Sequence, residues 1–256
     1  QKERRLPNRR IEVYRYAAET LVESWPRVQR SIVFDSEEVL SLLAPVAYRI
    51  FSQQSSEEIA EDELFEMLVD LFPRLKPGLN PTEAKSYLRE LLPQLSEHSG
   101  LFLERGFDAE RGQRLYGFLH LTFAEYLAAR HLASLLEVEK EDDKRRDFLA
   151  KYALVPRWRE VVLLMTAHIG LDGRRAAATQ VLSDILQMNL PCDDHLHRKI
   201  LLAGHCLADD LRVNSEAAAW VFEQLTKILI ETPVAPLQNQ IIEINRIAKG
   251  RYTRTR

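Results

Sequence analysis

Apolar side chains recur every three or four residues over most of the first hundred positions, which is the spacing of amphipathic helices. The first such stretch stops at Pro26, and a later one stops near Pro73, before the turn formed by residues 76–81. The spacing predicts four successive helices, at about residues 7–25, 35–51, 55–73 and 82–98.

Two of these predicted helices are preceded by residue pairs at the spacing of a capping box. Asp35 and Glu38 precede the second helix, and Ser55 and Glu58 precede the third. In a capping box, the first side chain accepts from an N–H of the first turn while the second reaches back to the N–H of the cap residue. We therefore expect the third helix to begin near Ser55 and to carry Ile59 on its apolar face.

The apolar period changes after residue 100. Residues 101–105 and 114–119 are strand-like, and the glycine-containing residues 106–112 join them, so a β-hairpin is predicted. Three helices followed by a hairpin are in the order of a winged-helix domain. A further helix is predicted after the hairpin, at about residues 122–136.

His120 lies at the predicted junction between the second strand and this further helix. Thr122 and Glu125 stand at capping-box spacing, so the helix is expected to begin at Thr122 and to leave His120 just before it. We expect Phe118 and Phe123 to fix the segment in the core. An imidazole held in this way could reach a ligand on a neighbouring domain, whereas the ordinary alternative is a histidine bonded to a backbone carbonyl.

The rest of the chain is predicted to be helical, with short breaks, at residues 148–152, 158–169, 174–187, 195–208, 214–230 and 236–248. Successive helices with tight turns are typical of stacked antiparallel pairs, as in a HEAT-like array. Residues 137–146 are almost all charged and are expected to form a solvated helix end or linker. The predicted fold is mainly α, with a winged-helix domain that carries a short β-hairpin, followed by a HEAT-like helical array. The predicted domains are residues 1–33, 34–136 and 137–256.

Composition indicates a soluble globular protein. Apolar residues make up 46% of the chain and charged residues 29%, and the net charge of -3 provides no general attraction to nucleic acid or to anionic membranes. The most apolar run, residues 161–165, is far shorter than the roughly 20 residues that span a bilayer. Two cysteines make no disulfide framework and no signal peptide is apparent, so a cytoplasmic location is expected. The chain begins at Gln1 rather than Met, from which we expect a piece of a longer polypeptide.

A metal or redox site is one alternative function. Its candidate ligands are Cys192, Asp193, Asp194, His195, His197, His205 and Cys206. Their spacing matches no familiar zinc pattern, and His195 and His197 would point to different faces of a helix. Buried cysteines and capping aspartates are the simpler interpretation, so no metal site is predicted.

DNA binding through the helix predicted at residues 82–98 is a second alternative. The charged residues of this helix are Glu83, Lys85, Arg89, Glu90 and Glu97. A helix that reads DNA presents a basic face, and this one does not, so nucleic acid is not an expected partner. A third alternative is a protein-binding helical scaffold that has no nucleotide role.

Four stretches of the chain resemble one known family. The most specific is residues 118–129 (FLHLTFAEYLAA), which resembles the signature in the winged-helix domain of NACHT-type STAND NTPases, the class that includes NOD-like receptors and their bacterial relatives. Residues 6–10 (LPNRR), 99–105 (SGLFLER) and 157–161 (RWREV) resemble the end of the preceding helical domain, the first wing strand and the start of the helical arm. The sequence departs from the pattern at Ala124, where the family usually has Gln.

The resemblance implies that His120 binds nucleotide by reaching the β-phosphate of ADP, which holds the protein in an off state until ADP is exchanged for ATP. The ADP or ATP, with Mg, would be held by an upstream NACHT core of the same polypeptide. The resemblance also implies a protein ligand or trigger, a homo-oligomer in the active state, and a role in innate immune signalling or bacterial antiviral defence. The chain has no G-x-x-x-x-G-K-[ST] loop and no strand ending in paired acids that would bind magnesium, so we expect no catalytic residues and no enzyme activity in this chain by itself.

Overall fold

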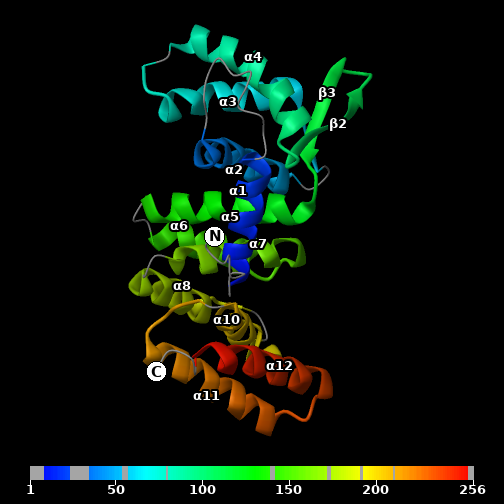
Figure 1. Ribbon diagram of the computed structural model, residues 1–256. Helices are drawn as coiled ribbons and strands as arrows, with labels where there is room; N and C mark the ends of the chain where they lie inside the picture. The colour runs from blue at the N-terminus through cyan, green and yellow to red at the C-terminus, as the bar shows by residue number, and fades with distance from the viewer. Residues whose placement is uncertain are drawn as a thin grey trace, which may run out of the picture. The chain divides into compact units, whose positions relative to one another are not determined.

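The N-terminal half of the chain contains helices and a small sheet, and the C-terminal half contains successive helices (Figure 1). The structure is a computed structural model that describes residues 9–23, 35–53, 57–78, 80–138, 142–171, 174–190, 193–209 and 211–252. The chain divides into two compact units, residues 1–131 and 132–256. The domain boundary predicted at residue 33 lies outside the described residues.

The helices of the first unit are α1 (Arg10–Glu23), α2 (Ser36–Ser52), α3 (Glu61–Leu75), α4 (Pro81–His98) and the start of α5 (Leu121–Val138). The strands are β1 (Glu58–Ala60), β2 (Phe102–Asp108) and β3 (Gln113–Phe118). They form one antiparallel sheet in the order β1-β3-β2. Helix α3 packs on α2 and α4, and α4 also packs against β2, which is the arrangement of a winged helix.

The capping box predicted at the start of α2 is confirmed. The Asp35 carboxylate accepts from the Glu38 N–H at 2.7 Å, and the Glu38 carboxylate accepts from the Asp35 N–H at 3.0 Å. Helix α4 begins with a second capping box, formed by Asn80 and Glu83. These side chains satisfy N–H groups that the first turn of a helix leaves without a backbone partner.

The helix start predicted at Ser55 and Glu58 is wrong. Glu58 belongs to β1, where it pairs with Gly117, and α3 begins only at Glu61. Ile59 pairs with Tyr116 in the sheet and is 1% exposed, so its buried apolar side chain belongs to a strand and not to a helix. A strand of three residues is too short to show an alternating pattern, and its pairing with β3 comes from tertiary contact. Ser55 lies outside the described residues.

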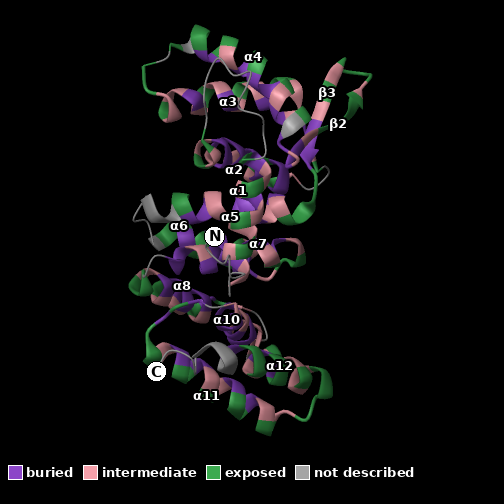
Figure 2. Cartoon of the chain, in the orientation of Figure 1, coloured by how far each residue is buried: buried purple, intermediate pink, exposed green. Residues whose placement is uncertain are grey.

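The second unit is helical throughout its described residues. It contains α6 (Asp142–Tyr152), the 3-10 helix η2 (Pro156–Trp158), α7 (Arg159–Ile169), α8 (Arg175–Gln187), α9 (Asp193–Leu196), α10 (Arg198–Ala208), α11 (Ser215–Glu231) and α12 (Ala235–Tyr252). Helices close in sequence pack together, such as α7 with α8 and α10 with α11 and α12. Buried residues line the faces by which these helices meet (Figure 2). The chain is therefore mainly α, as predicted.

The prediction that residues 137–146 form a solvated segment is wrong for Arg145. Its side chain is buried, and its Nε donates to Oδ2 of Asp184 in α8 at 2.5 Å. Asp184 is 2% exposed and also accepts from the Gln180 amide at 3.1 Å. A charged run does not reveal which of its members has a buried counter-ion, and only such pairing allows a charge to be buried. Over the residues described, we find no helix that combines the length and the apolar character needed to cross a membrane.

Candidate functional site at the β3–α5 junction

Backbone hydrogen bonds fix the junction between β3 and α5 on both sides of His120. The Leu119 N–H donates to the Leu101 carbonyl oxygen at 2.9 Å, which ties the end of β3 to the residue just before β2. The Phe123 N–H donates to the His120 carbonyl oxygen at 3.1 Å, in the first turn of α5. The position of the His120 backbone is therefore defined by the sheet and by the helix.

The capping box predicted at Thr122 is misplaced. Helix α5 begins at Leu121, so Thr122 already lies in its first turn, and His120 directly precedes the helix. The backbone carbonyl of His120 accepts the hydrogen bond that closes this turn. A helix end depends on backbone geometry that residue spacing predicts only to within one or two positions.

Aromatic packing anchors the strand that leads to His120. The rings of Phe118 and Phe102 meet edge to face with centroids 5.1 Å apart, and both side chains are buried. Phe118 therefore lies in the core as predicted, whereas Phe123 is only half-buried. The preceding residue is Gly117, where a Cβ would come within 2.9 Å of the Glu57 carbonyl oxygen. The absence of a side chain at this position allows the chain before β1 to approach β3 closely.

The His120 side chain itself is exposed. Its ring lies 6.4 Å from the Phe123 ring, measured between centroids, and it makes no hydrogen bond or ion pair with a residue that the structure describes. Leu119 and Leu121 on either side of it are 38% and 46% exposed. Two exposed leucines that flank an unpaired imidazole give an apolar surface with one directional polar group at its centre.

Helix α5 is held a few turns further along by α1 and α2. The buried Tyr126 ring stacks on Tyr14 of α1, with centroids 6.1 Å apart, and burial raises the pKa of Tyr126. The Arg130 guanidinium donates to the Glu37 carboxylate and, at 3.2 Å, to the Ser41 hydroxyl, both on α2. The helix that follows His120 is therefore fixed at a second place. The sequence gives no sign of this ion pair, because its partners lie far apart in the chain.

Three of the candidate metal ligands, Asp193, His205 and Cys206, have other surroundings in the second unit. Asp193 accepts from the Arg198 N–H at 2.9 Å, and Cys206 is fully buried, which raises the pKa of its thiol to about 12. His205 lies within hydrogen-bond distance of the Arg159 guanidinium, at 3.0 Å, and of the Gln240 amide, at 2.9 Å. Burial and the nearby Arg159 lower the pKa of His205 to about 4. Cys192 lies outside the described residues, and within the described part no group of three Cys, His, Asp or Glu side chains is placed to hold a metal ion.

The helix–strand order and the packing of the first unit define a winged helix, with His120 exposed where the second wing strand ends and α5 begins. Residues 10–132 match the family model of the winged helix-turn-helix domain C-terminal to NACHT. The match includes α1 as well as the winged helix proper. The family is named for a position after the NACHT domain, so the matched region is not the NACHT domain itself. Comparison with curated proteins and with solved structures gives no match.

Proposed function

We propose that this chain is the regulatory region of a NACHT-type STAND NTPase and that His120 stabilises the ADP-bound off state. In this proposal the imidazole donates a hydrogen bond to the β-phosphate of ADP bound, with Mg, in a NACHT core upstream in the same polypeptide. The observation that carries the proposal is the exposed imidazole of His120, which has no partner in the described part of the chain and lies at a junction fixed from both sides. It stands in a region that matches a family of domains C-terminal to NACHT.

The chemistry of the junction suits a phosphate. An imidazole N–H is a directional donor, and a hydrogen bond to an anion is about twice as strong as one to a neutral acceptor. The exposed leucines beside it could pack on the surface around the nucleotide and exclude water from this bond. A contact made only in the off state biases the two-state equilibrium by its own free energy, about 1–3 kcal/mol. Its loss would therefore shift the equilibrium by about 5-fold to 150-fold.

In this proposal, the helical second unit would transmit the change between the off state and the active state. We propose that it connects the winged helix to a protein trigger or to the oligomeric active state, and that the whole protein works in the cytoplasm. The helical packing of α7 to α12 supports such a scaffold role, because stacked helices offer long surfaces on their polar faces. No residue in the described part identifies the trigger.

ADP retention by the full-length polypeptide tests the proposal. His120→Ala should release bound ADP faster and should oligomerise more readily with ATP. His120→Gln keeps an N–H donor and should recover part of the retention. His195→Ala changes another exposed histidine, on α9, and should release ADP at the wild-type rate. Wild-type retention in a normally folded His120→Ala protein would refute the nucleotide role and would leave this region a scaffold.

A further inference from the structure

The solvent-facing side of α11 carries a stripe of four exposed residues. Trp220, Glu223, Lys227 and Ile230 follow one another at steps of three, four and three residues, so they lie along one face of the helix. The opposite face carries the buried residues Ala218, Val221, Leu225 and Ile228. The stripe therefore points away from the core that α11 shares with α10 and α12.

The two ends of the stripe are unusually apolar for an exposed surface. Trp220 is 47% exposed and Ile230 is 77% exposed, although neither residue type is favoured on a surface. Between them stand Glu223 and Lys227, which form no ion pair with each other or with any residue that the structure describes. Two apolar groups thus enclose two opposite charges that have no partner among the residues described.

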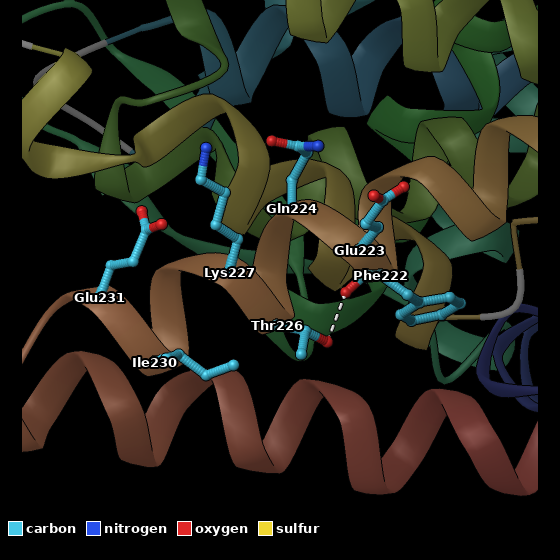
Figure 3. A pocket seen from close by; sticks show the side chains of 7 residues that line it. All are labelled: Phe222, Glu223, Gln224, Thr226, Lys227, Ile230 and Glu231. Carbon is cyan, nitrogen blue, oxygen red and sulfur yellow. Dashed lines mark hydrogen bonds between the residues drawn. The ribbon is translucent and has the colours of Figure 1, made fainter.

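A hollow of about 610 Å³ lies along the same helix, and Glu223, Lys227 and Ile230 contribute to its lining (Figure 3). All seven of its lining residues come from α11, so it is an open surface depression and not a cavity between helices. Trp220 is not among its lining residues and comes two positions before the first of them, Phe222. The depression is open to solvent, and its apolar lining residues are Phe222 and Ile230.

We propose that α11 forms a contact with α11 of a second copy of this chain, antiparallel and related by a two-fold axis. The spacing of the stripe is the same read in either direction, with its centre at Leu225. An antiparallel second copy therefore places its Trp220 beside Ile230, in the hollow, and its Lys227 beside Glu223. A two-fold axis repeats each pairing, as in every isologous interface, so both tryptophans and all four charges obtain a partner.

The chemistry of the stripe favours this partner over an unrelated one. A surface that matches itself in apolar character and in charge, residue by residue, is what a symmetric contact requires. A buried tryptophan is among the side chains that contribute most to binding at interfaces. A single helix face buries less area than a permanent dimer needs, so the association is weak and depends on protein concentration or on attachment to a larger assembly.

Exchange of the two charges tests the pairing. Lys227→Glu makes all four central residues acidic, and Glu223→Lys makes all four basic, so each variant should dimerise at least about tenfold more weakly than the wild type. The double variant Glu223→Lys/Lys227→Glu restores opposite charges and should associate within a few-fold of the wild type. In an equimolar mixture of the two single variants every central pair joins Glu to Lys, so the mixture should also associate.

Sedimentation velocity of the full chain, from micromolar to about 1 mM, measures these affinities. Ile230→Asp is a second variant, which should lose the apolar contact without altering the Glu223 and Lys227 side chains. Melting temperatures near that of the wild type show that the variants are folded. The proposal is overturned if the wild type stays monomeric over this range, if the single variants associate as it does, or if mixing them restores nothing. If mixing the two single variants restores association, the proposal is strongly supported. A charge that acted only within its own chain would not be compensated by a second chain.

Discussion

Gly117 is the residue at which a small change should disturb the sheet that carries His120. In Gly117→Ala the new Cβ would lie 2.9 Å from the Glu57 carbonyl oxygen and 3.1 Å from Cγ of Arg105. The carbonyl belongs to the backbone, so relief requires the chain before β1 to move away from β3 by a few tenths of an ångström. Overpacking of this kind costs about 1–3 kcal/mol, and the lower backbone entropy of alanine in the unfolded chain returns about 0.5–1 kcal/mol. The expected net loss is about 1–2 kcal/mol.

Gly106→Ala is the matched control, because Gly106 lies in β2 of the same sheet. A Cβ there meets nothing within 4 Å, and its backbone has no positive φ, so this variant should be neutral or slightly more stable. Hydrogen exchange of the β3 amides measures the free energy of opening the sheet in each protein. We expect faster exchange only in Gly117→Ala. Equal exchange in the two alanine variants would refute the argument that the close approach of Glu57 requires glycine.

Three further predictions concern stability. Asp184→Ala removes the buried carboxylate that pairs with Arg145 and should cost about 3–5 kcal/mol in urea unfolding, whereas a loss below about 1 kcal/mol would contradict a buried pair. Between pH 6.5 and 4 the unfolded chain protonates His205 while the folded chain does not, since burial and Arg159 lower its pKa to about 4. The free energy of unfolding should therefore decrease by about 2 kcal/mol as the pH is lowered from 6.5 to 4, allowing for partial exposure, and His205→Gln should flatten that part of the profile. Asp35→Ala removes the capping box of α2 and should lower the free energy of unfolding by about 1 kcal/mol in thermal melts, while a neutral result would mean that the cap is not formed in solution.

The features that local sequence predicts well are those determined by neighbouring residues. The capping box of α2 and the hairpin of β2 and β3 depend on side chains only a few positions apart, and both are present. Strand β1 is different, because Ile59 belongs to a strand only through its pairing with Tyr116, more than fifty positions later. The same reason explains Arg145, whose burial depends on Asp184 in another helix.

The position of the candidate site was predictable from the sequence, but the exposure of the leucines beside His120 was not. The strand-to-helix transition places His120 at a junction, and the structure has it there. Periodicity treats an apolar residue as a core residue, so it gives no reason to expect Leu119 and Leu121 on the surface. Their exposure follows from the change of direction at the junction, where the chain leaves the sheet before the helical face is established.

The two proposed contacts lie in separate units, and this makes their tests independent. His120 is in the first unit, and the stripe of Trp220, Glu223, Lys227 and Ile230 is in the second. Substitutions that share no interaction partner have additive effects on free energy. His120→Ala should therefore leave the association of the 256-residue chain unchanged, and Lys227→Glu should leave ADP release from the full-length resting protein unchanged. If Lys227→Glu also accelerated ADP release, the α11 contact would belong to the off state itself, and the two sites would be parts of one switch.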